Sequence, residues 1–584
     1  MKVLLSTFNA KYIHSSLALR SLAAYVRPVC SDVAVREYTI NNKLLEVLAD
    51  IYDCRPSILG LACYIWNIDM TLQLVRLLKQ VLPEVIVVAG GPEVSFGSDE
   101  LLAENPGIDY CLSGEGEEAL AELLTALQTG GDVQGIDGLT WRLHGQTVTN
   151  GGFRVMPDLG ALPFPYSKDD LADLSERIVY YESSRGCPFS CQYCLSSATR
   201  GVRHVPLNRV LEDMQTFINA GVRQVKFVDR TFNADKRHYL PLLRHLAAQE
   251  CGTNFHLEIA ADRLDAEALE VLNSAPAGRF QLEIGIQSTH EPTLEAIQRR
   301  NNWPRIVSHV TELRRAGRIH LHLDLIVGLP YESYEQFGQS FNDVYRLRPH
   351  MLQIGFLKLL KGSGIRESAA RHGYLFTPFA PYEVLANSYL SYGDIRQIQI
   401  MEDVFQQTYN SGRFANTLDW LVEQVGGDPF RLYMELAAYW QRHDLQMTAH
   451  SAKSVSRFLR DFAAEIGGDT ALCGELLKFD ALTSDGGRLR PDHLPWNGDA
   501  WQEQKNAFWR NEQVASKYIA GYRFSAWREI KRLYHLEVFS GALLEQLGAG
   551  RCERSAVLFD YGGGQIIWRA LKESDFWREE TDAL

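Results

Sequence analysis

The chain has 584 residues, a net charge of −13 and a sequence pI near 5.7. Hydrophobic residues make up 46% and charged residues 22% of it, which is typical of a soluble globular protein. The acidic net charge argues against a nucleic-acid partner, because phosphate binding needs a basic surface. The length predicts several domains.

The first residues, MKVLLSTFNAKY, lack the apolar run and cleavage site of a signal peptide. The sequence contains no stretch of about 18 apolar residues without charges, so no membrane span is predicted. Seven of the ten cysteines are scattered along the chain, a pattern that fits a reducing compartment better than a disulfide framework. We therefore expect a cytoplasmic protein.

Residues 1–152 alternate short apolar runs with amphipathic stretches. This alternation predicts a Rossmann-like open parallel sheet, closed by a β-hairpin at Gly138–Gly152. The strand candidates are Lys2–Thr7, Val33–Tyr38, Ile58–Tyr64, Val85–Ala89 and Asp109–Leu112.

Residues 153–175 contain a proline-rich stretch without periodicity and are interpreted as a linker. Residues 176–375 repeat the strand–helix alternation six times, which predicts a partial (β/α)6 TIM-like barrel with its chemistry at the C-terminal strand ends. Residues 376–584 are predicted to be mainly helical, with strands as an option in SAVLFDYGGGQIIWR. The barrel strand candidates are Ile178–Ser183, Gln224–Asp229, Asn254–Ile259, Phe280–Ile286, Leu321–Val327 and Leu352–Leu357.

The motif RGCPFSCQYC contains Cys187, Cys191 and Cys194, separated by three and then two residues, directly after a predicted strand. A turn of this kind can bring three thiolates to one metal centre. Three thiolates leave a cubane [4Fe–4S] cluster one ligand short of the usual four, so that one iron stays open to a substrate. The alternatives are a zinc site with a remote fourth ligand, or three unpaired thiols. Zinc sites generally use paired C-x2-C spacing, and the sequence has no second pair.

C-x3-C-x2-C after the first strand of a β/α barrel resembles the radical S-adenosylmethionine (SAM) superfamily. In that family the open iron binds SAM, and one electron cleaves it to a 5′-deoxyadenosyl radical. The resemblance therefore implies a reducing electron donor such as flavodoxin or ferredoxin, and a small-molecule or peptide substrate. It also implies that residues near the cluster and the strand ends bind SAM: Tyr193 at adenine, Asp229 at the methionyl amino group, Glu258 at the third strand, Gln287 and Ser288 near ribose and carboxylate, and Gly328 in the fifth-strand turn.

Glycines follow two strands of the first domain. Gly90 and Gly91 follow the fourth-strand candidate, and Gly114 and Gly116 follow the next one. Ligands of open sheets bind outside the carboxyl ends of the strands, and glycine lets a ligand approach the backbone closely. Plain turn chemistry is the alternative. The arrangement resembles the cobalamin-binding domain that precedes the barrel in one branch of the superfamily.

The loop after the first strand departs from the D-x-H-x-x-G motif of many cobalamin proteins. Tyr12 and Leu17 replace its aspartate and glycine, and Cys63 replaces the serine usual after the third strand. We therefore expect that cobalamin binds and that His14 does not ligate cobalt.

The resemblance favours a cobalamin-dependent radical SAM enzyme that transfers a methyl group to an unactivated carbon. A radical cyclase or rearrangement enzyme without methyl transfer is the first alternative. A methylthiotransferase would need three further cysteines in loops and a β-rich RNA-binding tail, and a cobalamin or redox sensor would not turn over SAM. The helical C-terminal third, around Tyr392–Phe414, resembles a domain of unknown function that follows the barrel in one subgroup.

Overall fold

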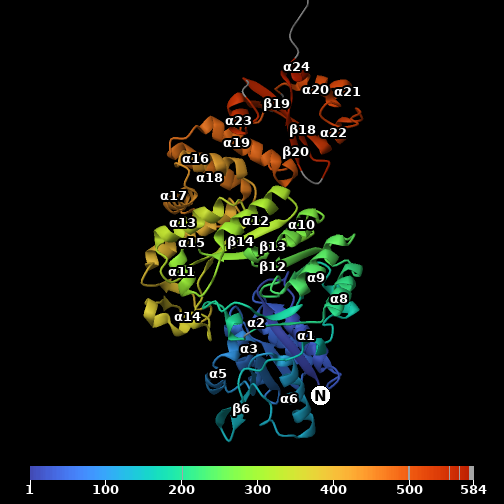
Figure 1. The fold of residues 1–584 in the computed structure, drawn as a ribbon, viewed down its shortest axis with the longest axis vertical. Helices are drawn as coiled ribbons and strands as arrows, with labels where there is room; N and C mark the ends of the chain where they lie inside the picture. The colour runs from blue at the N-terminus through green and yellow to red at the C-terminus, as the bar shows by residue number, and fades with distance from the viewer. Residues whose placement is uncertain (200, 498–499, 551–552, 564–565, 578–584) are drawn as a thin grey trace, which may run out of the picture. The chain divides into compact units, whose positions relative to one another are not determined.

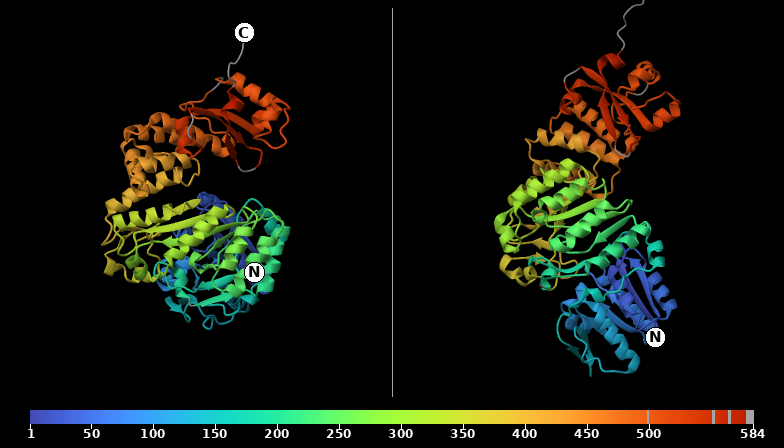
Figure 2. Two further views of the ribbon diagram at one scale, coloured as in Figure 1. Left: turned by 45° about the horizontal axis from the view of Figure 1, so that its top comes forward. Right: turned by 45° about the vertical axis from the view of Figure 1, so that its right-hand side comes forward.

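The computed structural model describes residues 1–199, 201–497, 500–550, 553–563 and 566–577. They form two compact units, Met1–Ile395 and Arg396–Leu584. The first unit contains one mainly parallel and one wholly parallel sheet, and the second combines helices with a small antiparallel sheet (Figures 1 and 2). The mixed α/β fold expected from the sequence is thereby confirmed, and the limits of the four predicted segments stay predictions.

The first sheet has the strand order β2-β1-β3-β4-β5-β6-β7. Its first five strands run parallel, and β6 and β7 are antiparallel. The strand order reverses between β1 and β3, so this edge is the topological switch point where open sheets bind ligands. The strands are β1 (Val3–Asn9), β2 (Val33–Thr39), β3 (Ile58–Ala62), β4 (Ile86–Gly90), β5 (Tyr110–Leu112), β6 (Leu139–Leu143) and β7 (Gln146–Thr149).

Helices cover both faces of this sheet (Figure 1). Side chains of α1 and α6 form one apolar core with it, and those of α2, α3 and α5 form the other. The Ser16 side chain caps α1 by accepting a hydrogen bond from the Leu19 amide. The helices are α1 (Leu17–Val26), α2 (Leu44–Cys54), α3 (Ile68–Val81), α4 (Pro92–Ser95), α5 (Ser98–Glu104) and α6 (Gly116–Thr129).

The predicted hairpin is present as β6–β7. Its turn residues His144 and Gly145 both have positive φ, as a two-residue type I′ turn requires. The predicted linker contains a short 3-10 helix at Leu159–Ala161 and the helix α7 (Lys168–Asp173). A capping box starts α7: Ser167 and Asp170 satisfy each other's backbone amides.

The second sheet has six parallel strands in the order β15-β14-β13-β12-β11-β8. Burial alternates along the strands, which places one set of side chains against the outer helices and the other inside the partial barrel. The strands are β8 (Val179–Tyr181), β11 (Gln224–Phe227), β12 (Asn254–Glu258), β13 (Phe280–Gln287), β14 (His320–Val327) and β15 (Met351–Phe356); the helices are α8 (Leu207–Asn219), α9 (Lys236–Ala248), α10 (Ala266–Ser274), α11 (Glu291–Ala296), α12 (Trp303–Ala316) and α13 (Tyr334–Tyr345).

The cysteines do not follow the first barrel strand directly. After β8 the chain forms β9 (Ser184–Cys187), which pairs antiparallel with β10 (Gly201–His204). Cys187 is the last residue of β9, so a two-stranded ribbon carries the cysteine loop. The 3-10 helix Leu195–Ala198 follows the third cysteine.

A short two-stranded ribbon and small helices end the first unit: α14 (Gly364–Glu367), a 3-10 helix (Ala369–His372), β16 (Leu375–Phe376) and β17 (Val384–Ala386). The second unit is mainly helical, and its sheet β18-β19-β20 includes the strands expected in SAVLFDYGGGQIIWR. Among the described residues, no helix meets the length and hydropathy needed to cross a membrane. The remaining elements are α15 (Tyr392–Gln407), α16 (Ala415–Gln424), α17 (Pro429–Arg442), α18 (Ala452–Glu465), α19 (Thr470–Thr483), α20 (Gln502–Arg510), α21 (Glu512–Ala515), α22 (Trp527–Leu533), β18 (Tyr534–Ser540), α23 (Gly541–Gln546), β19 (Arg554–Asp560), β20 (Ile567–Ala570) and α24 (Glu573–Phe576), with 3-10 helices at Leu445–Met447 and Asp485–Gly487.

Candidate functional site

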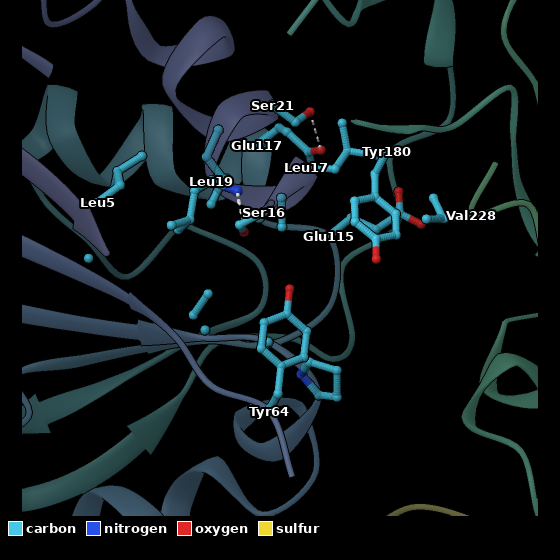
Figure 3. A pocket seen from close by; sticks show the side chains of 18 of the residues that line it. Leu5, Ser16, Leu17, Leu19, Ser21, Tyr64, Glu115, Glu117, Tyr180 and Val228 are labelled. Atoms are coloured by element: carbon cyan, nitrogen blue, oxygen red, sulfur yellow. Dashed lines mark hydrogen bonds between the residues drawn. The ribbon is translucent and has the colours of Figure 1, made fainter. Parts of the chain in front are cut away.

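A cavity of about 660 Å³ lies at the carboxyl ends of the first sheet, at its topological switch point. Figure 3 shows Ser16 and Leu19 of the α1 region on one side of it and Tyr64, from the loop after β3, on the opposite side. Tyr180 and Val228 of the barrel also line the cavity (Figure 3). The space is therefore bounded by the first sheet and the barrel together.

All four predicted glycines line this cavity. Gly91 has a φ of 103° and a ψ of −179°, and a Cβ added to it would lie 2.6 Å from the Cys63 carbonyl oxygen. Gly114 also has positive φ, and its Cβ would overlap the Arg154 backbone. Both positions need glycine for the backbone itself, whereas Gly90 and Gly116 leave more room. Gly91 and Gly114 are therefore required by the backbone conformation of their turns, and they also line the cavity.

His14 lines the same cavity, and its Nδ1 lies 2.6 Å from the Tyr180 hydroxyl oxygen. Burial lowers the pKa of His14, with Lys11 and Lys226 adding to the effect. One ring nitrogen is therefore engaged with the barrel. This contact gives His14 a structural role that joins the first loop to β8.

A buried ion network forms the wall between the first domain and the cysteine ribbon. Arg185 of β9 contacts Glu117 at 2.5 Å, Glu182 at 2.7 Å and Glu115 at 3.3 Å. Arg203, opposite Arg185 on β10, contacts Glu115 at 2.5 Å. Burial raises the pKa of Glu182 to about 7, against the lowering effect of Arg185. The network ties the loop after β5 to the strand that ends in the first cysteine.

The three motif cysteines line one second cavity of about 230 Å³. Arg299 lies beside it: one guanidinium nitrogen is 3.8 Å from Cys191 Sγ and 3.1 Å from the Tyr193 hydroxyl oxygen. Cys187 Sγ lies 3.5 Å from Thr231 Oγ1, and the Ser196 amide donates to Cys194 Sγ at 3.4 Å. Burial raises the pKa of the Cys191 thiol, and the neighbouring Arg299 guanidinium opposes that effect.

The donor set fits a cluster better than a single metal ion. Within the described residues, no group of three or more His, Cys, Asp or Glu side chains is arranged to hold one ion. In a cubane each thiolate binds a different iron, so the sulfurs surround a volume and do not converge on a point. Three thiols around a shared cavity meet that requirement.

Tyr193, Glu258 and Gln287 line the cysteine cavity, as the resemblance implies for SAM-binding residues. Burial raises the pKa of Glu258 to about 7, and Glu283 adds to the effect. Gln287 has a positive φ of 71° at a register shift of β13 against β14. Gln287 keeps the same phase of β13 as Glu283 and Gly285, which also line the cavity.

Asp229, Ser288 and Gly328 are not among the residues that line the cavity. The Asp229 carboxylate is fully buried and accepts hydrogen bonds from the Ser183 amide and hydroxyl and from the Ser184 hydroxyl. Ser288 is also fully buried and donates to Glu332 at 2.5 Å. Gly328 forms a turn whose carbonyl accepts from Tyr374 and Asn387. These positions do not support the expected direct contacts with SAM.

Sequence reasoning missed four charged residues that line the cavity: Arg230, Glu283, Arg299 and Asp324. Burial, with Glu283 and Glu258, raises the pKa of Asp324 to about 8, and its buried Oδ1 has no hydrogen-bond partner among the described residues. Contacts with His256 and Lys226 outweigh burial at Glu283 and lower its pKa to about 2. The cavity wall therefore carries one carboxyl held neutral and one held ionised.

Three family models match successive parts of the chain. Residues 3–124 match the B12 binding domain, residues 181–344 the radical SAM superfamily, and residues 370–559 a protein family of unknown function, DUF4080. The domain order expected from the sequence is thereby matched.

Curated relatives resemble about half of the chain. The cobalamin-dependent radical SAM methyltransferase TokK of Streptomyces tokunonensis is 28% identical over 50% of this chain and 46% of its own length. The anaerobic magnesium-protoporphyrin IX monomethyl ester cyclase of Synechocystis sp. is 26% identical over 39% of this chain and 47% of its own. The chain thus spans about half the length of the curated relatives it matches.

Among solved structures, the cobalamin-dependent SAM radical enzyme OxsB has a TM-score of 0.60. It is 13% identical, with 84% of this chain and 82% of that chain covered, so the likeness concerns the fold. The match over residues 181–344 places a radical SAM domain in this chain, and the fold agrees with it. The chain belongs to the group that has a B12-binding domain before the barrel and a DUF4080 domain after it. The expectation of a radical SAM enzyme with a [4Fe–4S] cluster, SAM and cobalamin is confirmed at the level of these domain families.

Proposed function

We propose that this protein is a cobalamin-dependent radical SAM methyltransferase acting on an unactivated carbon. The observation that carries the proposal is that the glycine-lined cavity and the cysteine cavity adjoin, because Arg230 borders both. When bound, the cluster and SAM would supply the radical and cobalamin the methyl group. Adjacent cavities would keep the reacting groups together without passage through water.

The residues of the chain have separate tasks in this proposal. Cys187, Cys191 and Cys194 would hold the cluster, with its fourth iron position left to SAM. Tyr193 and Gln287 would orient SAM within the cavity that they line. Gly91 and Gly114 would leave space for the corrin at the strand ends. A reducing donor such as flavodoxin or ferredoxin would supply the electron.

Product analysis tests the proposal. Anaerobically reconstituted protein with dithionite, SAM and hydroxocobalamin should form both 5′-deoxyadenosine, from radical cleavage, and S-adenosylhomocysteine, from methyl transfer. Cys194→Ala should abolish 5′-deoxyadenosine formation. Cys251→Ala is the matched control, because this part-exposed cysteine lies outside the cavity and should leave the yield unchanged.

The cyclase relatives motivate the second candidate, a radical cyclase or rearrangement enzyme without methyl transfer. It predicts 5′-deoxyadenosine without S-adenosylhomocysteine under the same conditions. That outcome would replace the methyltransferase proposal while keeping the radical site. Formation of neither product by fully loaded protein would favour a sensor.

A further inference from the structure

A third cavity, of about 280 Å³, lies beside the other two within the first unit. The loops after β4 and β5 of the first sheet form one side of it. The strand β9 and the segment just after Cys194 form the other side. It shares Gly91 and Gly114 with the glycine-lined cavity and Ser196 with the cysteine cavity. A molecule in this space would therefore border both proposed cofactor sites.

Arg230 lines all three cavities. Its side chain is solvent-accessible, and no hydrogen bond or ion pair joins its guanidinium to another described residue. The other arginines of the site are satisfied: Arg185 by three glutamates, and Arg299 by Tyr193 and the Gly285 carbonyl. Arg230 is thus a positive charge at the junction without a hydrogen-bonded or ion-paired partner among the described residues; Glu258, across the cysteine cavity, interacts with it only at longer range.

Neighbouring carboxylates do not fill this role. Asp229 precedes Arg230, but its carboxylate already accepts hydrogen bonds from Ser183 and Ser184. Glu182 and Glu115, which also line the third cavity, are bound by Arg185 and Arg203. A guanidinium in this setting binds an oxyanion through charge-assisted, often bidentate hydrogen bonds.

The other part of the cavity is apolar. Phe96 and Phe153 stack there with ring centroids 5.8 Å apart and an interplanar angle of 29°, and Phe153 is 39% exposed. Leu195 and Val228 add aliphatic surface. Stacked rings with an exposed face suit a flat apolar group.

We propose that the third cavity receives the substrate, and that the substrate is a small molecule with an oxyanion group bound by Arg230 and a flat apolar part against Phe96 and Phe153. The assignment rests on the proposed function, because a methyl acceptor must reach both cofactors. It adds a substrate class: amphiphilic carboxylates or phosphates.

Equilibrium dialysis with a matched pair of probes tests the inference. The protein carries its cluster, SAM and hydroxocobalamin, and the probes are 2-naphthoate and the neutral 2-naphthylmethanol. The intact protein should bind naphthoate about tenfold more tightly than the alcohol, the size expected for one charged hydrogen-bonded contact. Arg230→Gln should remove this preference, and Arg230→Lys should keep part of it. Phe153→Ala should lower the affinity for both probes by the same factor.

Arg223→Gln is the control, since Arg223 precedes the same strand but is exposed and pairs with Glu176. Equal affinity of the intact protein for both probes would overturn the inference. So would an Arg230→Gln variant that loses SAM affinity and keeps the naphthoate preference, because the guanidinium would then serve the methionyl carboxylate. The measurement needs no turnover, so its failure is distinct from a failure to form S-adenosylhomocysteine.

Discussion

Replacing Gly91 by alanine separates the backbone requirement of the glycine-lined cavity from the space that it offers a ligand. Gly90 and Gly91 both line the cavity. The nearest atom to an added Cβ at Gly90 is the Leu112 carbonyl oxygen, at 3.7 Å, which is an ordinary contact. Gly90→Ala therefore adds the same methyl group without strain and is the matched control.

The cost at Gly91 has two sources. Its φ of 103° and ψ of −179° lie in a region that is essentially restricted to glycine, where another residue costs about 1–3 kcal/mol. The new Cβ would also lie 2.6 Å from the Cys63 carbonyl oxygen and 3.1 Å from its amide nitrogen. Backbone atoms cannot swing away as a flexible side chain can, and overpacking of this kind costs about 1–3 kcal/mol. Together we expect about 2–6 kcal/mol of local destabilisation.

Hydrogen exchange and cobalamin titration measure the two consequences. Amides of β4 and α4, residues 86–95, should exchange faster in Gly91→Ala than in Gly90→Ala. The loop can relieve its strain by moving, and cobalamin must then restore it. We therefore expect hydroxocobalamin affinity to fall at least about tenfold, since 1.4 kcal/mol corresponds to a factor of ten.

One outcome would contradict this reasoning about Gly91. If Gly91→Ala exchanges and binds hydroxocobalamin as Gly90→Ala does, the positive φ and the Cys63 contact do not constrain this loop. Weak binding by both variants would instead mean that any methyl group at this edge blocks the ligand, and that backbone strain is not the cause.

Two further predictions concern ionisable residues. His14→Ala should leave hydroxocobalamin affinity and the cobalt absorption spectrum unchanged, because Tyr12 and Leu17 replace the aspartate and glycine of the ligating motif. The Tyr180 contact engages only Nδ1, so a changed spectrum would identify the other ring nitrogen as a cobalt ligand. Asp324→Asn should gain thermal stability relative to the intact apo-protein as the pH rises from 3.8 to about 8, and no further above that. A carboxyl whose pKa is raised in the folded state loses its stabilising contribution over this range, and the asparagine does not titrate; a pH-independent difference in Tm would contradict it.

The alternating pattern of the strands carried more information about the site than the motif resemblance. Along β11 and the residues after it, Val225, Phe227 and Asp229 are fully buried, whereas Val228 and Arg230 line the cavities. Side chains alternate between the two faces of a strand, so a carboxylate in phase with buried core residues points away from the barrel interior. Parity along this strand indicates Arg230 as the cavity residue in place of Asp229.

The same period explains the other strands. On β13, Ser288 is in phase with the buried Ile284 and Ile286, while Gln287 is in phase with the cavity. On β14, Asp324 occupies the part-exposed phase and lines the cavity. Motif resemblance locates the strand end, and parity selects the residue. The capping box at Ser167 was a local signal for α7 that the surrounding prolines obscured.

The cysteine ribbon could not be read from local sequence, because β9 and β10 pair across the whole cysteine loop. Each of these two strands has only four residues, which carry little strand signal of their own. The ribbon is instead held by the ion network: Arg185 and Arg203 lie opposite each other and bind Glu115, in the loop after β5, and Glu117, in the first turn of α6. Such a pattern depends on side chains 68 to 88 positions apart.

The ion network also means that the glycine-lined cavity and the cysteine loop are not independent. Glu115 lies between Gly114 and Gly116, which line the first cavity, and Arg185 lies two residues before Cys187. Removing Arg185 would leave Glu117 and Glu182 without their ion-pair partner, at about 3–5 kcal/mol, and would release both the loop and the ribbon. A variant on one side must therefore be tested for cluster content and cobalamin uptake together, because loss of either follows from movement of the same wall.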